Sequence, residues 1–220
     1  MPRTIAIDGP VAAGKTTVGK LVAQKLDYLC VDTGFFYRAV TYIALKKKLD
    51  IKDNNATSDI AQNIDIQIKS VDGQTQIFSE GKNITPYLRT PEVDKTVSFP
   101  SANPVVREAL TPQMRKVAED YKVIMLGRDI GTVVLPNANL KIWLDADAPT
   151  RAKRRILEQK AKGLKPKYQE VLNDMIKRDK IDSSRQAAPM QKSVDAITID
   201  TSNLTIPQVV RKVIDLIKTT

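Results

Sequence analysis

The chain has 220 residues, 42% of them hydrophobic, which allows a packed core and excludes a disordered or fibrous protein. It contains one cysteine, Cys30, and no histidine, which excludes an intrachain disulfide, a zinc site built from Cys and His, and catalysis by imidazole. Lys and Arg outnumber Asp and Glu by 35 to 25, which points to a nucleic acid, an acidic membrane surface or a phosphorylated small molecule as partner.

Five short apolar runs, rich in β-branched residues, predict the strands of a parallel sheet. They cover residues 5–7, 29–31, 123–126, 140–144 and 196–199. Helical spacing of apolar residues predicts helices over 18–26, 36–44 and 168–176, and the prolines at 149 and 207 mark two further helix starts. The pattern favours an α/β fold with a five-stranded parallel sheet flanked by helices. Ligands of such sheets bind at the carboxyl ends of the strands.

Residues from about 64 to 85 depart from this pattern. Isoleucines alternate with polar residues at 64–68, and the Asp72-Gly73 pair is typical of a hairpin turn, so we predict a small antiparallel β insertion. Asn103-Pro104 predicts a helix start, and Pro112 then predicts a kink or a division into two helices. The run at 163–166 (GLKP) is typical of a short linker.

The segment after the first strand matches the phosphate-binding pattern G-x-x-x-x-G-K-[ST], followed by an amphipathic helix. Its glycines allow close wrapping around phosphate, Lys15 is expected to reach the β- and γ-phosphates of ATP, and the Thr16 hydroxyl is expected to ligate Mg²⁺. An accidental glycine-rich turn would lack the flanking strand and helix. The predicted ATP-binding residues here are Gly9, Pro10, Val11, Ala12, Ala13, Gly14, Lys15, Thr16 and Thr17.

The segment 32–38 (DTGFFYR), after the second strand, resembles the acceptor-binding segment of nucleoside monophosphate kinases, and most closely that of the bacterial cytidylate kinases. The resemblance covers nearly the whole chain, and its most specific motif is GRDIGTVV at 127–134. It continues through Glu92-Val93, 104–110, Arg178-Asp179, Arg185 and Ala188-Pro189.

This resemblance implies a P-loop kinase that transfers the γ-phosphoryl group of ATP to CMP or dCMP with Mg²⁺. It implies a single domain with a core at 1–62 and 104–220. It also implies an NMP-binding insertion at about 63–103 and an arginine-rich lid at about 151–167.

The resemblance also implies roles for individual residues. Thr33, Arg38, Arg128 and Arg185 match positions that hold the CMP phosphate. Ser98, Arg107 and Asp129 match positions that contact cytosine, and Arg178 and Asp182 match positions that meet the sugar hydroxyls. The residues implied to act in catalysis are Lys15, Asp32, Arg128 and Arg154.

Three of these assignments leave alternatives open. Arg178, Asp182 and Arg185 are spaced i, i+4 and i+7, which predicts one shared helix face that grips a ligand or, alternatively, an exposed ladder of ion pairs. Asp129 is either the reader of the base or a structural partner of Arg128. Asp32 is expected to hold a Mg²⁺-bound water or to orient neighbouring side chains.

The chain departs from the family pattern at two positions. The family usually shows RD-x-RD-x-x-R, but Ile181 stands in place of the second arginine, which removes one cation. Leu126 stands where an acidic residue often precedes the GRD motif, and this changes no assignment made above.

The charge excess is concentrated between 151 and 167, where eight basic residues face one acidic residue. Arg151, Arg154 and Arg155 are spaced i, i+3 and i+4, and this spacing predicts one basic helix face that closes over ATP as a lid. The alternative is a solvated basic face or a nucleic-acid patch, although no aromatic residue interleaves the cations.

A phosphate monoester is largely a dianion at neutral pH and needs no general base, so the missing histidine is no obstacle to this chemistry. A different class stays open, namely a P-loop regulatory or RNA-binding NTPase, and so does a kinase for UMP or for a small acid. Because the sequence starts without a signal peptide and has no long apolar run, we expect a cytoplasmic protein. We expect a monomer whose partners are CMP, dCMP and ATP, with no membrane and no nucleic acid required.

Overall fold

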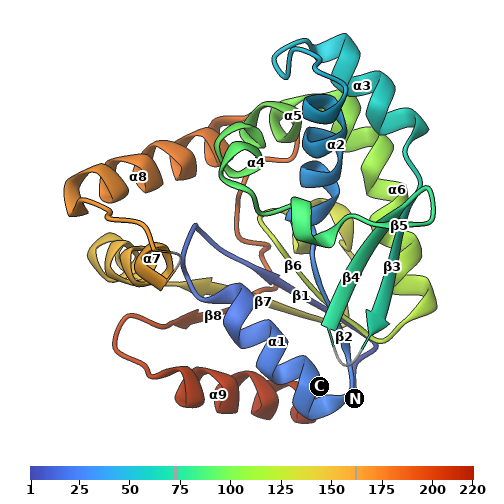
Figure 1. The fold of residues 1–220 in the computed structure, drawn as a ribbon. Helices are drawn as coiled ribbons and strands as arrows, with labels where there is room; N and C mark the ends of the chain where they lie inside the picture. The colour runs from blue at the N-terminus through green and yellow to red at the C-terminus, as the bar shows by residue number, and fades with distance from the viewer. Residues whose placement is uncertain (72–73, 162) are drawn as a thin grey trace. The chain divides into compact units, whose positions relative to one another are not determined.

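The computed structural model describes residues 1–71, 74–161 and 163–220, and their elements alternate as expected for an α/β fold (Figure 1). The elements are β1 (Thr4–Asp8), α1 (Lys15–Leu26), β2 (Leu29–Asp32), α2 (Gly34–Lys46), α3 (Asn54–Asn63), β3 (Ile66–Val71), β4 (Gln74–Ser79), β5 (Lys82–Asn83), η1 (Thr85–Tyr87), α4 (Pro91–Thr96), α5 (Ser98–Ala102), α6 (Pro104–Asp120), β6 (Val123–Gly127), η2 (Ile130–Val134), β7 (Leu140–Asp145), α7 (Ala148–Ala161), α8 (Tyr168–Ser184), β8 (Ile197–Asp200) and α9 (Ile206–Thr219).

The predicted five-stranded sheet is confirmed. Its strand order is β2-β6-β1-β7-β8, and a separate three-stranded sheet has the order β3-β4-β5. The chain divides into two compact units, which are described separately below. Unit 1 is Met1–Tyr28 with Ile124–Thr220, and unit 2 is Leu29–Val123. Unit 2 contains the insertion predicted at about 63–103 and extends beyond it on both sides.

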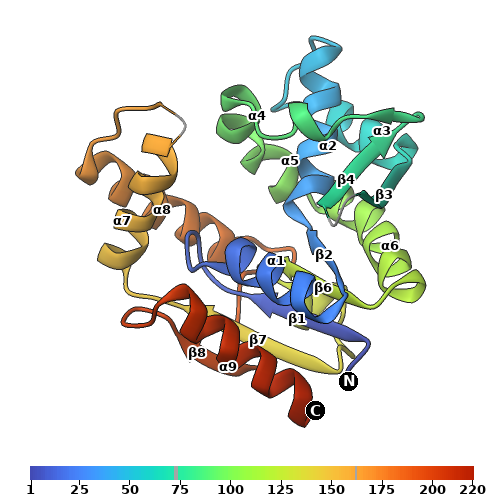
Figure 2. The same cartoon turned by 60° about the horizontal axis from the view of Figure 1, so that its bottom comes forward.

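In unit 1, β7 pairs in parallel with both β1 and β8, with Ile7 opposite Ile142 and Leu144 opposite Ile199. β1 and β7 are largely buried, whereas β8, at the edge of the sheet, buries only Ile199. Helices α1 and α9 lie side by side, as Figures 1 and 2 both show. The helix start predicted near Pro207 is confirmed, and α9 begins with a capping box between Thr205 and Gln208.

In unit 2, helix α2 packs against α3, and α3 packs against α6 (Figure 1). The predicted antiparallel insertion is confirmed, because β3 pairs antiparallel with β4 and buries alternate residues Ile66 and Ile68. The Asp72-Gly73 turn predicted between these strands lies outside the described residues. No helix in the described part of the chain is long and apolar enough to cross a membrane.

The prediction of a helix break at Pro112 is wrong in one respect. α6 runs as one helix from Pro104 to Asp120 with Pro112 inside it, so the segment is not two helices. Packing explains the continuity, since Val106, Leu110, Met114 and Val117 lie on one buried stripe that continues past the proline.

Candidate active site

The phosphate-binding pattern forms the connection between β1 and α1 in unit 1. Gly9 has a φ of 146°, and a Cβ built there would lie 2.0 Å from the carbonyl oxygen of Leu144. Gly14, just before α1, has a φ of 97° with open space where a Cβ would be. Gly9 is therefore required by close approach to β7, and Gly14 by its left-handed backbone.

The lysine of this loop is held by the loop itself. Lys15 is buried, and its Nζ donates to the carbonyl oxygens of Gly9 at 2.6 Å and Pro10 at 2.7 Å. Thr16 follows in the first turn of α1, where N–H groups at a helix N-terminus favour an anion. The loop therefore combines a desolvated cation, a hydroxyl and a helix N-terminus, which is the arrangement that binds polyphosphate.

A buried carboxylate connects this loop to the GRDIGTVV segment. Asp8, the last residue of β1, accepts hydrogen bonds from the backbone N–H groups of Ile130 at 2.9 Å and Gly131 at 2.8 Å. Burial raises the pKa of the Asp8 carboxyl to about 6, against the lowering effect of these two hydrogen bonds. Asp8 thus fixes the turn η2, which follows Arg128 and Asp129.

Four of the predicted substrate-binding residues come together in unit 1. Arg128 donates from Nε to Asp182 at 3.0 Å and from Nη1 to the Gly9 carbonyl oxygen at 3.0 Å. Arg185 donates from Nη2 to Asp129 at 3.1 Å, and its Nη1 lies 3.6 Å from the other oxygen of Asp182. We call Arg128, Asp129, Asp182 and Arg185 the arginine–aspartate cluster.

The helix face predicted for Arg178, Asp182 and Arg185 is not fully formed. Helix α8 ends at Ser184, so Arg185 lies in extended backbone just past the helix and does not continue the predicted i, i+4, i+7 face. Arg185 and Asp182 do form an ion pair, as the alternative of a ladder predicts, but the pair is not exposed, with side-chain exposures of 7% and 13%. Arg178 lies half-buried on α8, within the same unit.

The three predicted lid arginines lie on α7 and contact different partners. Arg151 is buried and donates to the carbonyl oxygens of Ala146 and Val11, both at 3.0 Å. Arg154 donates to the hydroxyl of Thr201 at 2.9 Å and to its carbonyl oxygen at 2.7 Å. Arg155 pairs with Glu158 one turn away at 3.0 Å. Arg151 and Arg154 are therefore hydrogen-bonded to other segments of unit 1, whereas Arg155 pairs within its own helix.

The remaining predicted residues belong to unit 2. Asp32 ends β2, where it accepts from the Gly34 N–H at 3.0 Å and from Arg89 at 2.9 Å. Thr33 is buried at the start of α2. Arg38, on α2, is also buried, and it donates to Asp94 at 2.5 Å.

The two unit 2 residues matched to cytosine lie on neighbouring helices, α5 and α6. Ser98 begins α5 and is half-buried, and Arg107 is buried on α6. Arg107 donates from Nη1 to the Ser101 carbonyl oxygen at 2.9 Å, and its guanidinium lies 5.0 Å from the centre of the Tyr37 ring. This cation–π contact helps to keep the guanidinium plane in place.

Sequence reasoning gave no role to three residues that contact the predicted ones. Arg89 contacts Asp32, and Asp94 contacts Arg38. Asp179 contacts Arg151 at 2.5 Å. Asp94 follows the Glu92-Val93 pair, and Asp179 belongs to the RD pair that carried the resemblance. The order of residues along the chain does not indicate these pairings, because every partner is at least 28 positions away.

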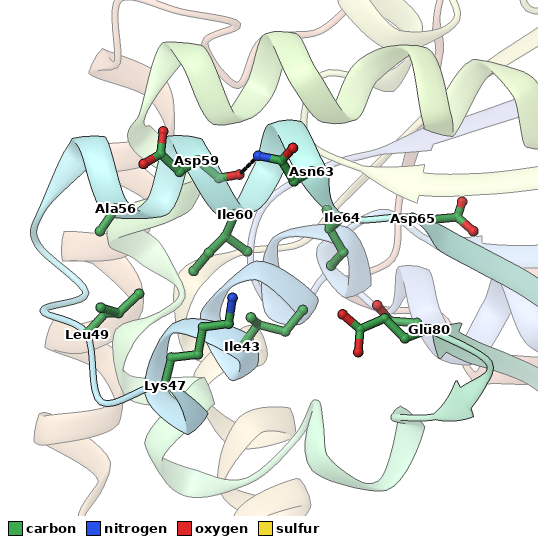
Figure 3. Close-up of a pocket in the computed structure, with 11 residues that line it drawn as sticks. Ile43, Lys47, Leu49, Ala56, Asp59, Ile60, Asn63, Ile64, Asp65 and Glu80 are labelled. Carbon is green, nitrogen blue, oxygen red and sulfur yellow. Dashed lines mark hydrogen bonds between the residues drawn. The ribbon is translucent and has the colours of Figure 1, made fainter.

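A hollow of about 510 Å³ lies elsewhere in unit 2, between α2, α3 and the end of β4 (Figure 3). Its floor is apolar, with Ile43, Ile60 and Ile64, and the carboxylates of Asp59 and Glu80 lie at its margin. None of the predicted site residues lines it. We therefore do not assign nucleotide binding to this hollow.

The fold and the loop together define a P-loop protein of the α/β class, with an arginine–aspartate cluster bonded to the phosphate loop. A family model for cytidylate kinase matches residues 5–219. The chain is 43% identical over 213 residues to a cytidylate kinase of Geobacillus sp. (strain WCH70), covering 97% of this chain and 95% of the relative. It is 40% identical over 214 residues to a cytidylate kinase of Bacillus cereus (strain ATCC 10987 / NRS 248), with the same coverage. The chain belongs to the cytidylate kinase family.

The fold is also similar to that of a solved structure. An uncharacterized protein from Eubacterium ventriosum ATCC 27560 matches with a TM-score of 0.55 and 14% sequence identity, covering 98% of both chains. At that identity the match supports the architecture alone.

Proposed function

We propose that the protein is a kinase that transfers the γ-phosphoryl group of ATP to CMP or dCMP, giving CDP or dCDP and ADP. The observation that carries the proposal is the bond between the arginine–aspartate cluster and the phosphate loop, from Arg128 Nη1 to the Gly9 carbonyl oxygen. This bond places a guanidinium group suited to an acceptor phosphate beside the loop suited to the donor phosphates.

Transfer between two polyanions requires alignment and charge neutralisation more than proton removal. The acceptor phosphate is already largely ionised at neutral pH, so no general base is needed. We assign Arg128 and Arg185 to the acceptor phosphate and Lys15 to the β- and γ-phosphates, where each stabilises charge in the transition state. We assign Arg178 and Asp182 to the sugar hydroxyls.

The carboxylate of Asp129 is suited to reading cytosine. Cytosine presents an exocyclic amine, and a carboxylate oxygen accepts its hydrogen bond, whereas uracil presents a carbonyl oxygen at the same place. In unit 2, we assign Thr33 and Arg38 to the acceptor phosphate and Ser98 and Arg107 to the base. Asp32 is proposed to orient Thr33 or a metal-bound water.

The residues of the phosphate loop also fit Mg²⁺. No group of three or more His, Cys, Asp or Glu side chains among the described residues is placed to hold a metal ion. Mg²⁺ bound to nucleotides needs no such cage, because it keeps several waters and uses phosphate oxygens as ligands. We propose that the Thr16 hydroxyl is the protein ligand. Bound Mg²⁺ would neutralise phosphate charge.

We further propose that the arginine-rich segment at about 151–167 serves as the lid over ATP, with Arg151 and Arg155 near the nucleotide and Arg154 at the transferring group. We propose a cytoplasmic monomer. The alternatives of a regulatory or RNA-binding NTPase and of a UMP kinase are less well supported, since the family model and both cited relatives carry the name cytidylate kinase.

A single assay tests the proposed function. Purified protein is mixed with ATP, Mg²⁺ and one nucleoside monophosphate at a time, and ADP formation is followed. We expect ADP to form rapidly with CMP or dCMP and slowly with UMP, AMP or no acceptor. Equal rates with and without CMP would contradict a kinase and favour a regulatory NTPase.

A further inference from the structure

Asp179 connects three segments of unit 1 through one carboxylate. Its Oδ1 accepts the backbone N–H of Val11 in the phosphate loop at 3.0 Å. Its Oδ2 accepts Nη1 of Arg151, on α7, at 2.5 Å. Asp179 itself lies on α8, so one side chain joins the phosphate loop, α7 and α8.

Arg151 completes a closed arrangement around Val11. The same Nη1 that contacts Asp179 also donates to the carbonyl oxygen of Val11 at 3.0 Å. Both backbone polar groups of Val11 are therefore bonded, the N–H to Asp179 and the carbonyl to Arg151. The ion pair is well shielded, with side-chain exposures of 10% for Arg151 and 16% for Asp179.

Apolar contacts support the same attachment. Ala152, Val171 and Met175, from α7 and α8, form a small buried cluster against which Val11 and Ala12 of the loop pack. Ala12 has a φ of 59°, a left-handed conformation that is unfavourable for a residue with a Cβ. The contacts of α7 and α8 hold the middle of the loop in a conformation that its sequence alone does not favour.

Two carboxylates of α8 thus have different partners. Asp182 contacts Arg128 in the arginine–aspartate cluster, and Asp179, one turn earlier, contacts the phosphate loop and α7. The spacing of three residues places them on the same side of the helix.

We propose that Asp179 is a positioning residue for ATP, acting through Val11 and Arg151. This inference rests on the proposed function only in naming ATP as the nucleotide. The N–H of Val11 is itself bonded to Asp179, so Asp179 acts by fixing the backbone that orients the neighbouring N–H groups of the loop toward the phosphates. Releasing Val11 therefore weakens ATP binding and leaves CMP binding unchanged.

Two variants separate the contacts of Asp179. Asp179→Asn keeps an oxygen acceptor for the Val11 N–H and removes the charge that pairs with Arg151, whereas Asp179→Ala removes both. Asp174→Asn is the matched control, because Asp174 is an exposed carboxylate on the same helix. Calorimetry gives the Kd of ATP and of CMP for each variant without requiring turnover, and thermal unfolding confirms that each is folded.

We expect Asp179→Ala to raise the Kd of ATP about tenfold and Asp179→Asn about threefold, with the Kd of CMP within about twofold of wild type. Asp174→Asn should leave both unchanged. A wild-type Kd of ATP in folded Asp179→Asn and Asp179→Ala would overturn the proposal, and so would an equal rise for CMP, which indicates a general structural loss. If Asp179→Ala does not fold, the Asn variant decides. Should the wild type show no CMP-dependent transfer, the proposed function fails, but the ATP affinities still test Asp179.

Discussion

Arg185 donates from Nη2 to Asp129 Oδ1 at 3.1 Å, and both side chains are almost fully shielded from solvent. The partner expected for Asp129 from its position in the chain was its neighbour Arg128, but Arg128 instead contacts Asp182. A carboxylate that accepts from Arg185 retains further acceptor capacity for the amine of a base. The geometry therefore leaves base reading and structural support as two separable roles of Asp129.

Asp129→Ala should lose CMP activity and narrow the preference for CMP over UMP. In the proposed assignment, the wild-type carboxylate would face the carbonyl oxygen of uracil, and an unpaired buried polar group costs about 1 to 3 kcal/mol, or roughly tenfold to a hundredfold in kcat/KM. Asp129→Asn is the sharper comparison, because its amide can donate to uracil. The measurement is kcat/KM for each nucleotide. An unchanged CMP/UMP ratio in both variants would restrict Asp129 to a structural role.

Lys15→Met should retain the fold and abolish phosphoryl transfer. The substitution keeps a similar side-chain length but removes a buried cation that is expected to move from the Gly9 and Pro10 carbonyl oxygens to the phosphates. Steady-state rates and circular dichroism measured together give the test. Near wild-type turnover would exclude the phosphate loop from the mechanism.

Replacing Arg151, Arg154 and Arg155 together by Gln should lower kcat more than it weakens CMP binding, because the lid is proposed to act on the transferring group. Arg151 and Arg154 also hydrogen-bond to the backbone of unit 1, so their replacement can affect stability. Arg155→Gln is the milder companion variant, because the contact described for Arg155 is its ion pair with Glu158. Rates are compared with CMP affinities from calorimetry. Unchanged kcat with loss of RNA binding would favour the nucleic-acid interpretation of the basic segment.

Asp8 should make folding stability depend on pH. Burial raises the pKa of its carboxyl from 3.8 to about 6, so between these values the folded state holds a proton that the unfolded state has released. The associated stability is fully present below about pH 4 and is lost as the pH rises through about 6, in total on the order of 3 kcal/mol. Nearby Asp129 contributes to the raised pKa, and Lys15 opposes it.

The measurement for Asp8 is urea unfolding of wild type and Asp8→Asn from pH 4 to pH 7.5. Taking the difference in free energy of unfolding between the two proteins removes the contribution of carboxyl groups that both contain. One such group is the exposed Asp147, because hydrogen bonds from Thr150 lower its pKa in both proteins. We expect wild type to lose stability relative to the variant as pH rises. A constant difference would show that Asp8 does not titrate in this range.

The sequence was sufficient to predict the parallel strands and the phosphate loop, because both depend on short contiguous patterns. It placed Arg128, Asp129, Asp182 and Arg185 in one site through the family resemblance, and the structure brings these four together. It did not predict where α8 ends, since the helical spacing continues through Arg185 while the backbone becomes extended there. It also did not indicate the partner of Asp179, whose contact with Val11 spans 168 positions and depends on how α8 packs.

Following the phosphorus atom itself establishes whether this chain moves phosphate from ATP to CMP. Wild-type protein is incubated with ATP labelled in the γ-phosphate, Mg²⁺ and CMP, and the products are separated. We expect the label to appear in CDP in amounts equal to the ADP formed, with little label released without CMP. Label recovered as inorganic phosphate, at a rate that does not depend on CMP, would show that the protein is not a CMP kinase.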